Sequence, residues 1–139
     1  MVDQNCAYCM EGELVAKFGI KICELETSKV YLFKEQSHPG RCIVAHKKHV
    51  GDMNELTAEE RAAYFEDVAR VARAIMAAFH PDKVNYGAYG DTGHHLHFHL
   101  CPKYKDEFEW GGVFLMNPDK KYLTDAEYAE MIEKIKANM

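Results

Sequence analysis

The sequence predicts an α+β domain, in which an antiparallel five-stranded sheet packs against one long helix and a C-terminal helix. Two observations support this class. Short β-like runs occur in two groups, and each group is followed by an amphipathic segment that starts with a helix-capping signature. No linker or low-complexity tract interrupts the 139 residues, so we interpret residues 1–139 as a single domain with one sizeable core.

The strands are predicted from runs of β-like residues. Gly19 to Glu26 alternates apolar and polar side chains, which is typical of a half-buried strand. Ser37 to Gly40 has the composition of a turn, and Gly90 to Gly93 separates the last two runs. The five expected strands are residues 19–26, 30–33, 42–45, 83–89 and 94–104.

The long helix is predicted from a capping box, because Thr57 at the N-cap and Glu60 three residues later satisfy two backbone donors. Pro81 ends it, since proline cannot continue a helical turn. Its expected buried stripe comprises Tyr64, Val68, Val71, Ala72, Ile75 and Phe79. A second capping box, Thr124 with Glu127, starts the C-terminal helix. Its expected stripe is Tyr128, Met131, Ile132 and Ile135.

Composition excludes several classes of protein. Seventeen Lys+Arg against 22 Asp+Glu give a formal charge of −5, which argues against a binder of nucleic-acid polymers. No apolar run reaches the roughly 18–20 residues that span a bilayer, so no membrane partner is expected. The first five residues lack a basic and an apolar signal region, which favours a cytoplasmic protein. The odd count of five cysteines then points to free thiols or metal ligands.

Three histidines recur with the period of a β-strand. Residues two apart share a face of a strand and lie about 6.5–7 Å from one another, so His95, His97 and His99 are expected on one face. The opposite face, which we expect to pack against the long helix, carries Leu96, Phe98 and Leu100. Two functional interpretations follow: a zinc site, or nucleophilic catalysis by one imidazole whose neighbours set its tautomer.

The run from His95 to Cys101 resembles the histidine triad family of nucleotide hydrolases and transferases, because it fits the family pattern His-φ-His-φ-His-φ-φ at every position, where φ is apolar. Cys6-x-x-Cys9, the segment from Cys42 to His49 and the capped helix resemble further parts of the family. The resemblance covers about residues 6–104, the expected core of the domain, and leaves residues 105–139 as a C-terminal extension.

The resemblance implies that His97 attacks the α-phosphorus of a nucleotide, and that water then cleaves the nucleotidyl-histidine. His99 is expected to contact a phosphate oxygen or to help protonate the leaving group. The second ring nitrogen of His97 should donate to a carbonyl that fixes the tautomer. No metal is expected in the chemistry itself. Expected substrates are nucleoside phosphoramidates, dinucleoside polyphosphates or related nucleotides.

Other residues are assigned to the substrate by the same resemblance. The stretch from Gly90 to Gly93 is expected to bind phosphate through backbone N–H groups and the hydroxyl of Thr92, although a plain turn is the alternative. Asn85 is expected to contact the nucleotide. Glu35 is a candidate for the acid that contacts the ribose.

Cys6 and Cys9 have the C-x-x-C spacing that supplies two of the four ligands in many zinc sites. The resemblance supplies His49 and His95 as the remaining ligands of a closed, structural zinc site. In the alternative interpretation, both cysteines are free thiols. The other three cysteines, Cys23, Cys42 and Cys101, are expected in the core.

The resemblance also implies a homodimer, with the long helix and a central strand at its interface. Trp110, the only tryptophan, either shapes the leaving-group side of a partner's pocket or covers the local core. Two other functions stay open. One is a zinc-dependent hydrolase with the metal on His95, His97 and His99; the other is a nucleotide-binding regulatory module with vestigial catalysis.

Overall fold

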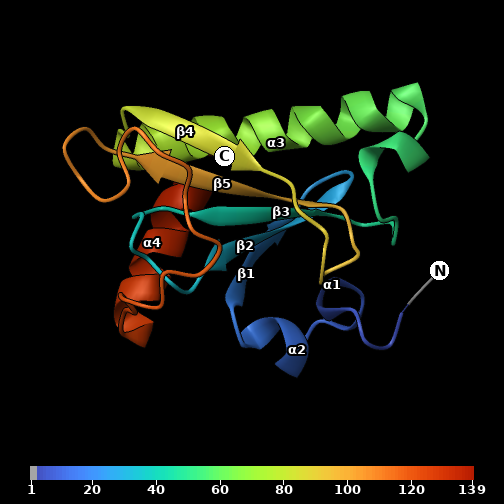
Figure 1. The fold of residues 1–139 in the computed structure, drawn as a ribbon, viewed down its shortest axis with the longest axis horizontal. Helices are drawn as coiled ribbons and strands as arrows, with labels where there is room; N and C mark the ends of the chain where they lie inside the picture. Colours follow the sequence, from blue (N-terminus) through green and yellow to red (C-terminus); the bar gives the residue numbers. More distant parts are fainter. Residues whose placement is uncertain (1–2) are drawn as a thin grey trace.

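The computed structural model describes residues 3–139, and its strands form one antiparallel sheet in the order β1-β2-β3-β5-β4 (Figure 1). This confirms the predicted α+β class with a five-stranded sheet. The strands are β1 Gly19–Glu24, β2 Ser28–Phe33, β3 Cys42–His46, β4 Lys83–Gly87 and β5 His97–Lys103.

Helices cover both faces of this sheet. The helices α3, Ala58–Phe79, and α4, Asp125–Ala137, supply the apolar side chains that bury one face. Two short helices, α1 over Ala7–Met10 and α2 over Glu13–Ala16, lie beside the other face (Figure 1). A 3₁₀ turn, Met53–Glu55, precedes α3. None of the helices in residues 3–139 has the length and apolar character needed to cross a membrane.

Both predicted capping boxes form, at Thr57 with Glu60 and at Thr124 with Glu127. Helix α3 ends at His80, whose φ of 53° places it in the left-handed region, and Pro81 follows directly. The sequence therefore locates both ends of the long helix correctly.

The sheet separates two groups of buried side chains. On the α3 and α4 face, Leu96, Phe98 and Leu100 join the main core, as the alternation of residues predicts. The smaller cluster on the opposite face consists of Tyr8, Val15, Tyr31, Phe33, Ile43 and Ala45. His97 and His99 lie on this second face, because their partners in the register are Ala45 and Ile43.

Strand β5 begins at His97, three residues later than predicted. The N–H of His95 bonds to the carbonyl of Gly93 at 2.7 Å, and the N–H of Leu96 bonds to that of Val50 at 2.7 Å. These bonds hold residues 93–96 as a loop, so His95 precedes the strand that carries the other two histidines. β1 and β4 end at Glu24 and Gly87, each two residues earlier than predicted.

A buried carboxylate joins α3 to the turn between β1 and β2. Asp67 accepts hydrogen bonds from the backbone N–H of Thr27 at 2.9 Å, from its hydroxyl at 2.7 Å and from the hydroxyl of Ser28 at 2.8 Å. The predicted helical stripe did not include this polar residue. Its three donors explain why burial is tolerated here.

We expect Asp67→Ala to lower the free energy of unfolding by about 2–4 kcal/mol, because it leaves buried donors without an acceptor. Urea denaturation measures this change. Glu66→Ala is the matched control, since the neighbouring Glu66 is exposed and pairs only with Arg73. Its expected effect is below about 0.5 kcal/mol. Equal losses in both variants would contradict the role of Asp67.

Candidate functional site

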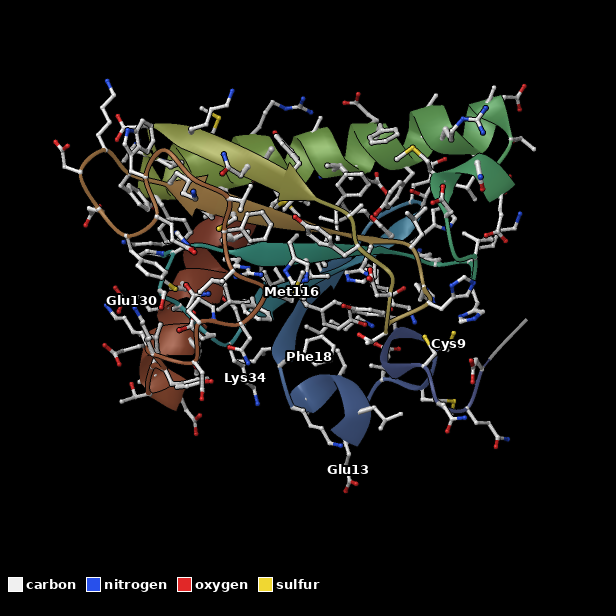
Figure 2. All side chains as sticks on the ribbon, viewed as in Figure 1. Cys9, Glu13, Phe18, Lys34, Met116 and Glu130 are labelled. Atoms are coloured by element: carbon white, nitrogen blue, oxygen red, sulfur yellow. The ribbon has the colours of Figure 1, made fainter. Side chains whose placement is uncertain are left out.

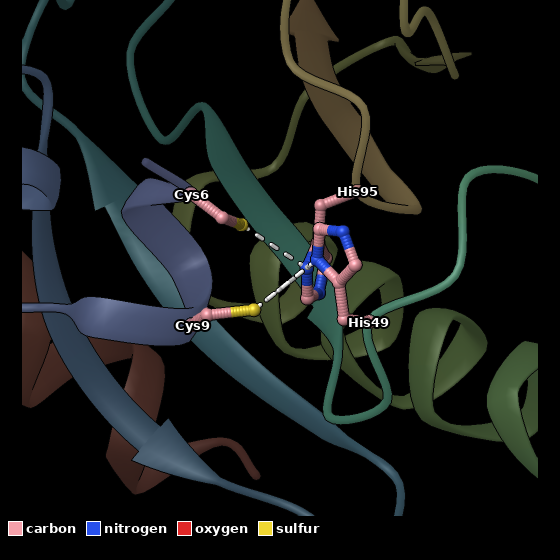
Figure 3. A group of neighbouring side chains, drawn as sticks. All are labelled: Cys6, Cys9, His49 and His95. Carbon is pink, nitrogen blue, oxygen red and sulfur yellow. Dashed lines mark hydrogen bonds between the residues drawn. The ribbon is translucent and has the colours of Figure 1, made fainter. Parts of the chain in front are cut away.

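Four side chains from three parts of the chain converge beside the start of β5 (Figure 3). Cys6 and Cys9 come from α1 and the residue before it, His49 from the loop after β3, and His95 from the loop before β5. All four potential ligand atoms lie within 4.8 Å of one another. The structure thus brings together the complete set of predicted zinc ligands.

The distances within this cluster suit a tetrahedral zinc ion. Zinc binds thiolate sulfur at about 2.3 Å and imidazole nitrogen at about 2.0 Å, which places neighbouring ligand atoms about 3.3–3.8 Å apart. The Cys6 Sγ to His95 Nδ1 distance is 3.3 Å, and Cys9 Sγ lies 3.2 Å from His49 Nδ1. The two Nδ1 atoms are 3.0 Å apart. The donor set and spacing fit zinc.

The outer nitrogen of His95 is also fixed. Its Nε2 donates to the main-chain carbonyl of His46 at 2.6 Å, so the lone pair of a neutral ring lies on Nδ1, toward the two cysteines. A hydrogen bond of this kind orients a histidine for metal binding. It also ties the last residue of β3 to the loop that leads into β5.

His97 has one ring nitrogen fixed in the same way. Its Nδ1 lies 2.7 Å from the main-chain carbonyl of His95 and donates to it, so Nε2 of the neutral ring carries the free lone pair. Burial lowers the pKa of His97 below its ordinary value and favours this neutral form. The ring of Tyr8 packs against it, with centroids 4.9 Å apart. The predicted tautomer-fixing carbonyl is therefore present.

The glycine-containing loop lies beside the reactive edge of His97. A side chain placed on Gly93 would put its Cβ 3.8 Å from Cε1 of His97, the carbon between the two ring nitrogens. Asp91, Thr92 and Gly93 are exposed, and Gly90 is half-buried. The loop thus reaches His97 at Gly93, and its backbone N–H groups could bind an anion there.

His99 is held by a residue that the sequence analysis missed. Arg41 is fully buried, and its Nη2 and Nε lie 3.0 Å and 3.3 Å from His99 Nδ1. Its other bonds reach the C-terminal segment, with Nη1 to the carbonyl of Leu115 at 3.0 Å and Nη2 to that of Met116 at 2.9 Å. The side chain of Met116 is labelled in Figure 2.

We call residues 105–124 the C-terminal segment; two more buried charged side chains bind its backbone. Glu35 accepts from the N–H groups of Lys120 at 2.8 Å and Lys121 at 2.9 Å. Lys103 donates from Nζ to the carbonyls of Glu109 and Gly112, both at 2.7 Å. The segment therefore packs on the sheet of its own chain.

Two residues assigned to the substrate lie apart from His97. Both Glu35 carboxylate oxygens bind groups of the protein, Ser37 among them, so this acid anchors the C-terminal segment. In the strand register, Gly87 lies opposite His99, whereas Asn85 lies opposite Cys101, two residues farther along β5. Asn85 lines a separate pocket of about 300 Å³ with Lys83, Lys103 and Trp110.

The triad histidines do not converge on one point that could hold a metal. Nδ1 of His95 faces the cysteines, Nδ1 of His97 bonds to a carbonyl, and Nδ1 of His99 bonds to Arg41. The buried guanidinium beside His99 would also repel a cation. This geometry argues against the zinc-dependent hydrolase.

Curated relatives cover most of this chain. Protein hit of Bacillus subtilis is 28% identical over an alignment of 123 residues, and the match covers 84% of this chain and 83% of that protein. The adenosine 5′-monophosphoramidase hnt1 of Schizosaccharomyces pombe is 26% identical over an alignment of 116 residues, and the match covers 77% of this chain and 80% of that protein.

Solved structures share the fold. A histidine triad protein of Sinorhizobium meliloti superposes with a TM-score of 0.84 at 22% identity, over 92% of this chain and 95% of that chain. A zinc-bound histidine triad family protein of Mycobacterium smegmatis superposes with a TM-score of 0.68 at 23% identity, over 96% of this chain and 91% of that chain. The HIT domain family model matches residues 19–106, more than half of the sequence, and the chain therefore belongs to the histidine triad (HIT) family.

Proposed function

We propose that this chain is a nucleotide hydrolase that acts through a covalent nucleotidyl-His97 intermediate. The observation that carries the proposal is the state of His97. Its Nδ1 donates to a main-chain carbonyl at 2.7 Å, which leaves the Nε2 lone pair free beside an exposed, glycine-containing loop. A neutral imidazole held in one tautomer is a competent nucleophile near neutral pH.

The reaction has two displacements at phosphorus. In the first, Nε2 of His97 forms a bond to the α-phosphorus, while the bond from phosphorus to the leaving nitrogen or oxygen breaks and the leaving group takes up a proton from solvent water. In the second, water attacks the same phosphorus and gives up a proton to solvent, the electron pair of the N–P bond returns to Nε2, and a nucleoside monophosphate leaves. His99 and the loop from Gly90 to Gly93 bind the phosphate oxygens during both steps.

Nucleoside phosphoramidates and dinucleoside polyphosphates are the substrates that we propose. The relative from Schizosaccharomyces pombe is named a monophosphoramidase, which supports the first of these classes. Adenosine 5′-phosphoramidate and a diadenosine polyphosphate are therefore the first compounds to assay. A nucleotide-binding module without catalysis would bind the nucleoside monophosphate and turn over neither compound.

The stereochemistry at phosphorus tests the intermediate. A substrate with one sulfur in place of an α-phosphate oxygen is chiral, and hydrolysis in ¹⁸O-labelled water makes the thiophosphate product chiral as well. Two in-line displacements retain the configuration, whereas one direct attack by water inverts it. We expect retention, and a nucleotidyl adduct on the native protein by intact-protein mass spectrometry after an alkaline quench, which preserves the N–P bond. Inversion of configuration would refute the covalent mechanism.

We also propose a structural zinc ion on Cys6, Cys9, His49 and His95. Distances of 3.0–3.6 Å between the ligand atoms support it, as does the zinc-bound relative from Mycobacterium smegmatis. Four protein ligands close a tetrahedral site and leave no position for a reacting water. The ion would fix α1, and with it Tyr8, against His97.

We further propose that the protein is a homodimer that uses α3. Phe65 and Met76 of this helix expose 39% and 48% of their surface, which is high for large apolar side chains. Light scattering after size-exclusion chromatography measures the mass. A monomer at micromolar concentration would contradict the proposal.

A further inference from the structure

Arg41 is a fully buried cation without a carboxylate partner among residues 3–139. The rings of Phe33 and Phe114 lie on its guanidinium, with centroids 4.2 Å and 4.8 Å from Cζ. Its polar contacts are two main-chain carbonyls of the C-terminal segment, the sulfur of Met116 and Nδ1 of His99. Burying an unpaired charge is costly, so this arrangement calls for a functional explanation.

The contact with His99 determines where the imidazole carries its proton. A guanidinium has only donors, so the nitrogen that it approaches must be an acceptor. Two guanidinium nitrogens, Nη2 at 3.0 Å and Nε at 3.3 Å, approach the same Nδ1. A neutral His99 then has its proton on Nε2, at the opposite edge of the ring.

We propose that Arg41 is a positioning residue that keeps His99 neutral with its proton on Nε2, so that His99 serves as a fixed hydrogen-bond donor. This role rests on the proposed function, because the acceptor of the His99 Nε2–H hydrogen bond is a phosphate oxygen of the substrate. It also makes His99 a poor proton shuttle, because Nδ1 is blocked by a permanent donor.

The surroundings of His99 support one protonation state. Phe33 of β2 and Phe114 of the C-terminal segment pack against its ring, at centroid distances of 5.3 Å and 6.3 Å. The ionisable groups that face it are Arg41 and His97, the latter at 5.4 Å. Burial and the charge of Arg41 lower the pKa of His99 to about 2, so no positive form is expected at neutral pH.

The tautomer can be observed without any substrate. Long-range ¹H–¹⁵N NMR spectra distinguish a protonated ring nitrogen from an unprotonated one, and a His99→Gln variant assigns the signals. In the wild-type protein at pH 7, we expect Nδ1 of His99 to be unprotonated and Nε2 to be protonated. A protonated Nδ1 would overturn the proposal, whatever the variants do.

Arg41→Met removes the donors but keeps an unbranched side chain of similar length. We expect its His99 to populate both tautomers, and kcat to fall on the order of 10–100-fold, as when the hydrogen-bond partner of a site histidine is lost. Arg41→Lys keeps a charged donor, so it should recover part of the tautomer preference and of kcat. A single Nε2–H tautomer with wild-type kcat in Arg41→Met would overturn the proposal.

Lys103→Met is the matched control, because Lys103 is another buried cation that binds main-chain carbonyls of the C-terminal segment. We expect this variant to keep the wild-type His99 tautomer. A tautomer shift as large as in Arg41→Met would assign the effect to the C-terminal segment and overturn the role of Arg41. Absence of turnover with every nucleotide would refute the proposed function alone, since the NMR result is independent of substrate.

Discussion

Replacement of His97 by alanine is expected to remove turnover of adenosine 5′-phosphoramidate, with a fall in kcat on the order of 10⁴-fold or more. The imidazole supplies the electron pair for the first displacement, and no neighbouring group can substitute. Nδ1 of His95 faces the cysteines, and Nδ1 of His99 bonds to Arg41. Steady-state release of the nucleoside monophosphate measures the effect.

His94→Ala is the control for this experiment, because His94 belongs to the same run of histidines but is exposed. It should retain wild-type kcat. A more specific check uses His97→Gly with a nucleoside 5′-phosphoimidazolide, whose N–P bond already exists and whose imidazole can occupy the space left by the side chain. We expect His97→Gly to hydrolyse this compound. Full turnover of the phosphoramidate by His97→Ala would show that His97 is not the nucleophile.

Removal of zinc is expected to lower the melting temperature by about 10–20 °C, because a ligand present at about a thousand times its Kd contributes about 4 kcal/mol to stability. The proposed ligands lie far apart in the chain, so a bound ion would crosslink the segment that holds Cys6 and Cys9 to the loop before β5. Thermal unfolding with and without a chelator measures the shift. Re-addition of zinc should reverse it.

Cys9→Ser should reproduce the effect of the chelator and bind less zinc, whereas Cys23→Ser should not, since Cys23 lies outside the cluster. We expect the chelated protein to keep measurable turnover below its new melting temperature, because His97, the proposed nucleophile, is not one of the proposed zinc ligands. Complete loss of activity in a chelated protein that is still folded would favour the zinc-dependent hydrolase. An unchanged melting temperature would contradict the structural zinc.

The parts of the structure that could be predicted from the sequence depend on local patterns. Both capping boxes are recognisable because the bonded residues are three apart, and the alternation of residues from Leu96 to Leu100 predicts that Leu96 and Phe98 lie in the core. The zinc ligands were assigned by resemblance, since 40 residues separate Cys9 from His49. The structure brings them together as expected.

The contact of Arg41 with the C-terminal segment could not be predicted, because main-chain partners leave no mark in the sequence. It binds the main chain of Leu115 and Met116, and any residues could supply those carbonyls. The same holds for Glu35, which was assigned to ribose but binds N–H groups from residues 120 and 121. The sequence signal for a structural role of these residues is a charged side chain next to an apolar strand, with Glu35 just after β2 and Arg41 just before β3.

The anchoring of the C-terminal segment through its backbone has an evolutionary consequence. Main-chain carbonyls and N–H groups persist under substitution, so the segment can change its outward side chains while its path over the sheet is kept. Val113 is 84% exposed and Leu115 is 54% exposed. Substitutions there should cost less than about 0.5 kcal/mol. Divergent sequences can therefore vary the outward side chains beside β5 without changing how the segment is attached to the sheet.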